Sequence, residues 1–200
     1  GSEAYEAMHT RAATLEDWTK EDVFRRTDAD SDLPKLPLAD TYVEPRAEQK
    51  RGQESHTDDV LALLGGLREG AAGITVLQAP FGHGKSLTCR VFASQCAGAW
   101  RRSELERYPV FIHTPDELRG GATTLEMAVR HHFEVELALS PDAARWIWQK
   151  VPLLLILDSY DEVVQDDATA KKWVQEMQRV MWVSTSGPRS RSSDARLGSR

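Results

Sequence analysis

The 200-residue chain is poor in the features that mark membrane and secreted proteins. It has two cysteines and no apolar run near the ~18 residues that a membrane-spanning helix requires. Its polar start, Gly1 to Lys20, lacks the apolar region of a signal peptide. We therefore expect a cytoplasmic protein with no membrane partner, and not a secreted scaffold built on disulfides.

The two cysteines also do not suit a disulfide with each other. Cys89 and Cys96 fall within one expected helix, where a separation of seven residues places their Cα atoms about 10 Å apart. Disulfide-bonded residues lie closer than this. We expect both to be small buried residues.

A clustered excess of basic residues is missing as well. The chain has 31 acidic and 25 basic residues, for a net charge of −6, whereas binding to nucleic-acid phosphates requires clustered Lys and Arg. Nucleic acid is therefore not an expected partner. The 40% content of hydrophobic residues is sufficient for one domain with a core.

The composition changes along the chain and predicts three regions. Residues 3–55 are polar and interrupted by prolines, which predicts a lead-in arm with a short amphipathic helix around Leu15 to Arg25. Residues 56–186 form the expected core, and residues 187–200 form a basic tail expected to be disordered. Gly1-Ser2 without an initiating Met resembles the remnant of an expression tag, so we expect a piece of a longer protein.

Hydrophobic spacing within the core region predicts alternating helices and strands. The expected helices cover His56 to Arg68, Leu87 to Trp100, a segment opened by a capping box at Thr123 and Glu126, a segment opened by Ser140-Pro141-Asp142, and Ala168 to Met181. The expected strands are Ile74 to Leu77, Pro109 to His113, Leu153 to Leu157 and a final one near Val180 to Thr185.

This alternation predicts an α/β fold with a mainly parallel, doubly wound sheet and helices on both faces. Sheets of nucleotide-hydrolysing domains with this order usually have five strands, and only four candidates occur. We therefore expect the fold to be truncated at its C-terminus.

A glycine-rich segment, Gly82-His83-Gly84-Lys85-Ser86, joins the first expected strand to a helix. Such a loop directs backbone N–H groups and a helix N-terminus at phosphates, while Lys85 neutralises charge and the Ser86 hydroxyl binds magnesium. The full pattern of a phosphate-binding loop requires Gly at position 79, where the chain has Ala. The alternative is an ordinary turn with Lys85 and Ser86 in solvent. The expected nucleotide-binding residues here are Ala79, Pro80, Phe81, Gly82, His83, Gly84, Lys85, Ser86 and Leu87.

A second motif, Leu153 to Asp158, supports the phosphate-binding interpretation. It places a carboxylate at the carboxyl end of a buried strand, where open α/β sheets bind ligands, so Asp158 is expected to hold Mg²⁺ together with Ser86. Asp161 and Glu162 follow as candidate catalytic residues, one of which would orient or deprotonate the attacking water. Capping and solvation are the alternative roles for these carboxylates.

The string from Leu154 to Glu162 resembles the extended Walker B motif of NACHT domains in the signal-transducing ATPases with numerous domains. Members of this family include animal innate-immune receptors and bacterial antiviral proteins. The resemblance implies ATP or ADP with Mg²⁺, further regulatory and sensor domains, and homo-oligomerisation on activation. It also implies that Tyr42 and Val43 lie near adenine; the alternative is that they pack the arm onto the domain.

Three functions follow from these motifs. The first is a slowly hydrolysing ATP switch of a NACHT-like signalling protein in innate immunity or antiviral defence. The second is a nucleic-acid-linked ATPase resembling the AAA+ class, and the third is a module that binds nucleotide or a partner without turnover. A small GTPase is disfavoured because its Asp-x-x-Gly motif would require Gly at position 161, where the chain has Asp. The guanine-binding motif Asn-Lys-x-Asp is also absent.

Overall fold

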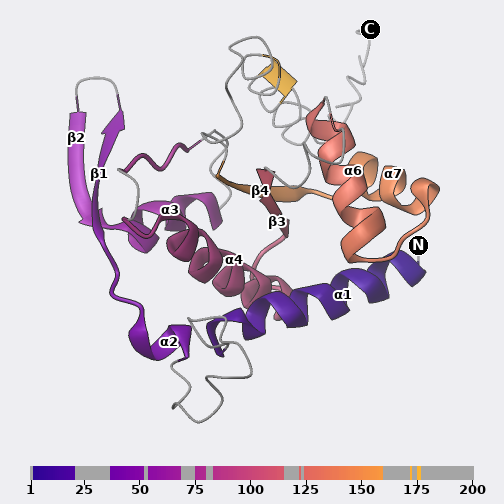
Figure 1. Ribbon diagram of the computed structural model, residues 1–200, viewed down its shortest axis with the longest axis horizontal. Helices are drawn as coiled ribbons and strands as arrows, with labels where there is room; N and C mark the ends of the chain where they lie inside the picture. The colour runs from indigo at the N-terminus through magenta and orange to yellow at the C-terminus, as the bar shows by residue number, and fades with distance from the viewer. Residues whose placement is uncertain are drawn as a thin grey trace, which may run out of the picture.

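A computed structural model describes residues 2–20, 37–51, 54–68, 75–79, 83–114, 122, 124–159, 172 and 175–176. These residues form a mixed α/β structure that is mostly helical and contains two small sheets of two strands each (Figure 1). The elements are α1 (Ser2–Asp17), the 3₁₀ helix η1 (Trp18–Lys20), α2 (Leu38–Thr41), β1 (Arg46–Arg51), β2 (Glu54–Asp59), α3 (Val60–Arg68), α4 (Lys85–Arg101), β3 (Tyr108–His113), α6 (Leu125–Glu136), α7 (Pro141–Lys150) and β4 (Leu153–Asp158).

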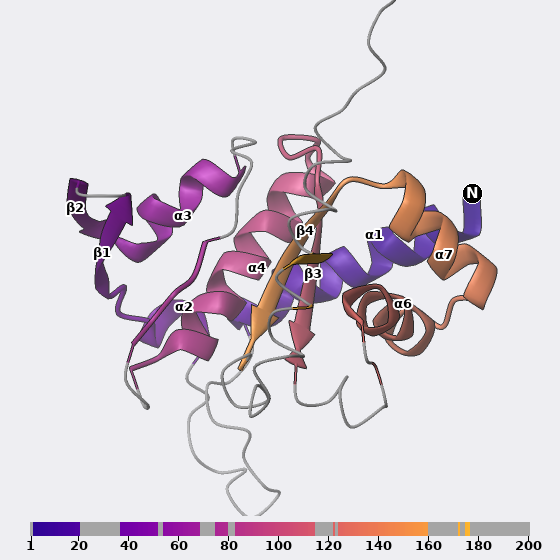
Figure 2. The same ribbon diagram turned by 90° about the horizontal axis from the view of Figure 1, so that it is seen from above.

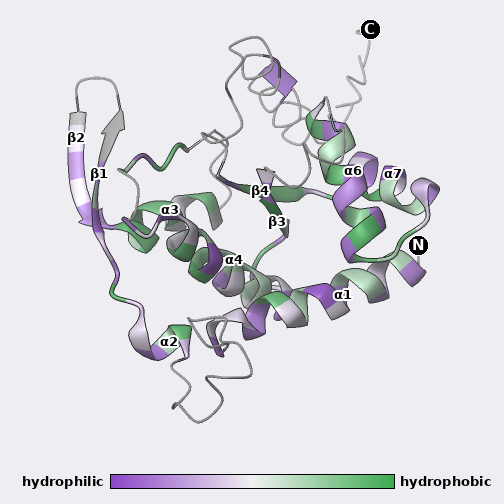
Figure 3. Ribbon diagram, viewed as in Figure 1, coloured by the Kyte–Doolittle hydropathy of each residue, from purple (hydrophilic) through white to green (hydrophobic). Residues whose placement is uncertain are grey.

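The strands β3 and β4 form the parallel pair at the centre of the molecule. Their register aligns Tyr108 with Leu153 at one end and His113 with Asp158 at the other. Both strands were expected from the sequence, and their position and type are confirmed. Figure 3 shows hydrophobic residues along both strands, whereas β2 in the outlying sheet is hydrophilic.

The wider parallel sheet expected from the sequence is not seen among the described residues. The expected strand Ile74 to Leu77 is wrong in its described part, because residues 75–79 form no strand and Val76 is largely exposed. The expected strand near Val180 to Thr185 lies outside the described residues. The structure therefore confirms an α/β composition and one parallel strand pair.

Helix α4 packs against the parallel pair and runs in the opposite direction. At its C-terminal end, the Trp100 ring lies 5.0 Å from the ring of Tyr108, which begins β3. Figure 2 shows the start of α4 on the same side of the molecule as the carboxyl ends of β3 and β4. The register and the helix direction together bring one end of α4 to one edge of the sheet.

The N-terminal region is part of the core, in contrast to the expected polar arm with a helix around Leu15 to Arg25. Helix α1 buries Ala4, Met8, Ala12 and Leu15, which recur on one helical face, and this helix lies along α4 (Figure 1). The Ser94 hydroxyl donates to the Glu16 carbonyl at 2.8 Å, which joins the end of α1 to α4. Two of these four buried residues are alanines, whose small side chains add little to a hydrophobic pattern in the sequence.

The region before α3 also differs from expectation. His56 to Asp59 belong to β2, which pairs with β1 in an antiparallel hairpin, and the helix begins at Val60. The Glu44 carboxylate accepts a hydrogen bond from the Leu61 N–H at 2.7 Å, so the helix is capped by a residue distant in sequence. Thr57 and Asp58, which fall within the expected helix, lie in the strand instead.

The starts of α6 and α7 depend on hydroxyl caps. The Ser140 hydroxyl accepts from the Ala143 N–H at 3.3 Å, as the sequence predicted for α7. At α6 the cap is Thr124, which accepts from the Met127 N–H at 3.1 Å, so the expected capping box was misplaced by one residue.

Both cysteines on α4 are free, as expected. Cys96 is buried in the core and Cys89 is half-buried. Within the described part of the chain, no helix has the length and apolar character needed to cross a membrane.

The position of α1 in the core predicts a stability effect of Leu15→Ala. Leu15 is 2% exposed, so its truncation should lower the free energy of unfolding by about 2–5 kcal/mol. Denaturant unfolding followed by circular dichroism measures this change. Thr14→Ala, at an exposed neighbour, is the control and should stay within about 0.5 kcal/mol of the parent. Equal, small effects of both changes would show that α1 is not part of the core.

Candidate functional site

The start of α4 is shaped by Gly84. This residue is the N-cap of the helix and has φ +77°, in the left-handed region that side chains other than Gly rarely adopt. Its carbonyl accepts the Thr88 N–H at 2.8 Å, which begins the helical hydrogen bonding. A methyl group at this position would meet no atom within 4 Å, so backbone conformation and not space requires glycine here.

Lys85, the first residue of α4, closes the loop that precedes the helix. Its Nζ donates to the Ala79 carbonyl oxygen at 2.8 Å. The loop positions Pro80, Phe81 and Gly82 lie outside the described residues. Ala79 stands where the motif requires Gly, and its contribution to the observed contact is a backbone carbonyl that any residue provides.

The other predicted residues of this turn differ in their exposure. His83 and Ser86 are exposed, while Leu87 is half-buried. The Ser86 hydroxyl therefore lies at the surface in the first turn of the helix, next to the Lys85 ammonium in sequence. The helix N-terminus supplies N–H groups at the same place, and such ends attract anions.

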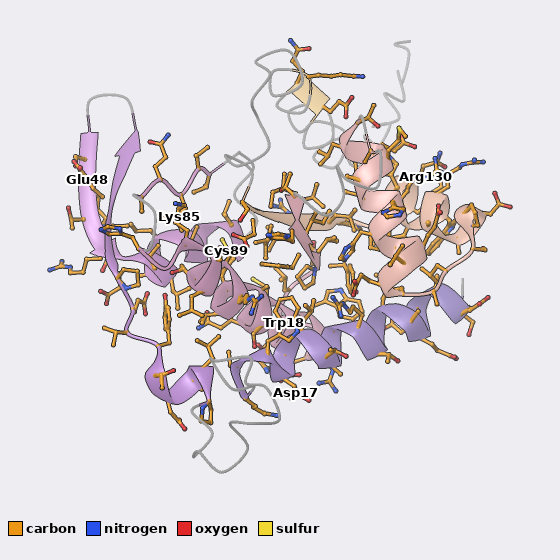
Figure 4. The ribbon with its side chains drawn as sticks, viewed as in Figure 1. Asp17, Trp18, Glu48, Lys85, Cys89 and Arg130 are labelled. Atoms are coloured by element: carbon orange, nitrogen blue, oxygen red, sulfur yellow. The ribbon has the colours of Figure 1, made fainter. Side chains whose placement is uncertain are left out.

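Asp158 ends β4 and is buried, with 6% exposure. Its charge acts on the thiol of Cys89 in the second turn of α4. Burial, and in addition the negative charge of Asp158, raise the pKa of Cys89 to about 12. Strand β4, which ends at Asp158, packs against α4, and Figure 4 shows Lys85 and Cys89 on the N-terminal half of that helix.

The chain turns sharply after Asp158. Ser159 has φ 56°, a left-handed conformation that costs a residue with a side chain about 1–2 kcal/mol. Non-glycine residues in this region often occur at functional sites. The candidate catalytic residues Asp161 and Glu162 follow outside the described residues.

Tyr42 approaches the same helix from a separate segment. Its hydroxyl and the hydroxyl of the buried Thr88 are 3.3 Å apart, and burial is the main cause that raises the pKa of Tyr42. Val43 is 87% exposed. The segment that contains the two predicted base-contacting residues is thus held at the second turn of α4, and Val43 is the member with apolar surface open to a ligand.

Two further residues at this edge were not singled out by the sequence analysis. His113 ends β3 and is aligned with Asp158, and Thr114 follows it with a fully buried side chain. The Thr114 hydroxyl has no hydrogen-bond partner among the described residues. Their position at the end of the second expected strand was the available signal.

The oxygen groups at this edge can be compared with those that bind magnesium in nucleotide sites. The described residues contain no group of three or more His, Cys, Asp or Glu side chains able to hold a metal. Mg²⁺ in nucleotide sites typically takes one or two protein oxygens, and phosphate and water complete its shell. The Ser86 hydroxyl and the Asp158 carboxylate are oxygen ligands of this kind, so the residues fit.

A scan against models of protein families finds no match for this chain. Neither a search of curated proteins nor a search of solved structures finds a similar protein. The case for a function therefore depends on the residues and the geometry of the site.

The strained backbone at Ser159 predicts an unusual order of stabilities. Ser159→Gly should have a higher free energy of unfolding than Ser159→Val by about 1–2 kcal/mol, because only Gly adopts this φ without steric cost. Thermal and denaturant unfolding measure the difference. The same two substitutions at the exposed Ser55 in β2 provide the control, since strands prefer Val to Gly. A Val variant at position 159 as stable as the Gly variant would contradict the left-handed turn.

The electrostatic effect of Asp158 on Cys89 predicts that a substitution at Asp158 changes the reactivity of the Cys89 thiol. Asp158→Asn removes a negative charge that raises the pKa of Cys89, so the thiolate fraction should increase and alkylation of Cys89 should accelerate. Peptide mapping after iodoacetamide treatment between pH 8 and pH 10 follows Cys89 separately from Cys96. Asp142→Asn, on the exposed face of α7, should leave the rate unchanged. Equal rates in both variants would place Asp158 away from the helix.

Proposed function

We propose that this chain binds ATP or ADP with Mg²⁺ at the start of α4 and acts as a slowly hydrolysing switch of a NACHT-like signalling protein. The proposal depends on one observation: Gly84, Lys85 and Ser86 begin α4 on the same side of the molecule as the carboxyl end of β4, where Asp158 lies (Figure 2). A phosphate site needs donors, a cation and an oxygen ligand for magnesium, and this edge has all three.

Each residue has a distinct role in this proposal. The turn at Gly84 allows the N–H groups at the start of α4 to face a phosphate, and the Lys85 ammonium neutralises part of its charge. Ser86 and Asp158 would hold Mg²⁺, which when bound offsets charge that develops on the phosphates. Asp161 and Glu162 remain the proposed groups that orient or deprotonate water, and Tyr42 and Val43 the proposed contacts of adenine.

The signalling role rests on the resemblance of Leu154 to Glu162 to the extended Walker B motif of NACHT domains. We propose a role in innate immunity or antiviral defence, in which nucleotide exchange controls homo-oligomerisation together with regulatory domains of a longer parent protein. A ligand can shift such an equilibrium only by binding one state more tightly than the other. Nucleotide at this edge would therefore have to bind either the monomer or the oligomer more tightly.

Titration of a fluorescent ATP analogue, with and without Mg²⁺, tests the site. Lys85→Ala should weaken binding about tenfold to a hundredfold, as expected for the loss of a charge-assisted hydrogen bond. Lys150→Ala removes an equal charge at the end of α7 and is the matched control. Asp158→Asn should reduce the difference between titrations with and without Mg²⁺. Binding that is unaffected by Lys85→Ala would refute the proposed site.

A substitution at Glu162 tests ATP hydrolysis separately from binding. If Glu162 orients or deprotonates the attacking water, Glu162→Gln should bind nucleotide normally and lower phosphate release by about a hundredfold, within the usual range for a general base. Phosphate release measured in excess ATP provides the rate. Tight binding without turnover in the unmutated chain would favour a non-hydrolysing module. Salt-sensitive binding of DNA would favour the nucleic-acid-linked ATPase.

A further inference from the structure

The parallel register places a second side chain beside Asp158. His113 on β3 and Asp158 on β4 are aligned partners, and partners in neighbouring strands project from the same face of a sheet. His113 is the exposed last residue of a strand whose other five residues are buried. The imidazole is thus the polar group of β3 at the edge where Asp158 ends β4.

The order of the elements along this edge determines which part of a ligand His113 would meet. In Figures 1 and 2 the carboxyl end of β4 lies between the start of α4 and the carboxyl end of β3. A polyphosphate held at Lys85 and extending along the edge would reach Asp158 first and His113 beyond it. The group farthest from the nucleoside is the terminal phosphate.

The next residue, Thr114, adds an independent observation at this position. Its side chain is fully buried, and its hydroxyl lacks a hydrogen-bond partner within the described part of the chain. Buried hydroxyl groups in native proteins are nearly always paired, and an exception calls for a specific explanation such as a bound group. The carboxyl end of β3 is therefore followed by a buried hydroxyl next to the exposed His113 in the sequence.

We propose that His113 distinguishes ATP from ADP. Its ring N–H donates a hydrogen bond to the terminal phosphate of ATP, which ADP lacks. The inference rests on the proposed nucleotide site and goes further, since it names the residue that distinguishes the two nucleotides. An imidazole carries an N–H donor in either protonation state, and a hydrogen bond to a charged acceptor is stronger than one between neutral groups.

Separate titrations of the full chain with MgATP and MgADP test this role. His113→Ala should weaken ATP binding about tenfold and leave ADP binding unchanged, the loss of one hydrogen bond to a charged group. His113→Gln retains an N–H donor and should recover part of the preference for ATP. His131→Ala, on the exposed side of α6, is the control and should change neither constant.

The outcomes separate this inference from the proposed function. Loss of ATP preference in His113→Ala, with an unchanged circular dichroism spectrum and an unchanged ADP constant, supports it. An equal effect on ATP and ADP, or no effect on either, overturns the role of His113 while the site at Lys85 stands. If the unmutated chain binds neither nucleotide, the proposed function fails and this inference fails with it.

Discussion

The packing of α4 between α1 and the parallel strand pair is the constraint on which the rest of the structure depends. Buried residues of α4, among them Phe92, Ala93 and Cys96, belong to the same hydrophobic core as those of α1 and β3. Burial of apolar surface on two sides fixes the position and direction of the helix. Because α4 runs opposite to β3 and β4, its N-terminus must lie at their carboxyl edge, where parallel sheets bind ligands.

The hydrogen bond between Lys85 and Ala79 would order a side chain of the proposed site before any ligand binds. A free lysine side chain has many rotamers, and ordering one on binding costs about 0.5–1.5 kcal/mol. The hydrogen bond to the Ala79 carbonyl orders the ammonium at the start of α4 beforehand. An ammonium has three donors, and this contact uses one of them. The glycine expected at position 79 is unnecessary for it, since the acceptor is a backbone oxygen.

The sequence predicted the elements whose signal is local. The aliphatic run Leu153 to Leu157, the strand Pro109 to His113 and the start of α7 at Ser140 are confirmed because burial pattern and capping chemistry are contained within a few residues. The relation between Asp158 and the start of α4 also agrees with the expected direction of strand and helix.

Other elements lack a local apolar pattern or a local cap and could not be predicted this way. The polar strands β1 and β2 have no apolar alternation, and α3 takes its cap from Glu44. His113 was overlooked because its significance comes from its register with Asp158, which exists only once the strands pair. The apolar run Ile74 to Leu77 gave the pattern of a strand, but its described part, residues 75–77, forms none.

Two of the left-handed residues, Gly84 and Ser159, are adjacent in sequence to residues of the proposed site. At Gly84 the conformation carries no steric cost, whereas at Ser159 a side chain adopts it at a cost that the rest of the fold must offset. Relieving that cost by a change of backbone at Ser159 would move the chain that leads to Asp161 and Glu162. A residue held in a left-handed conformation between the proposed metal ligand and the proposed catalytic carboxylates is placed where a small gain in contact energy could shift the balance between two arrangements, which is the property that a nucleotide-controlled switch would require.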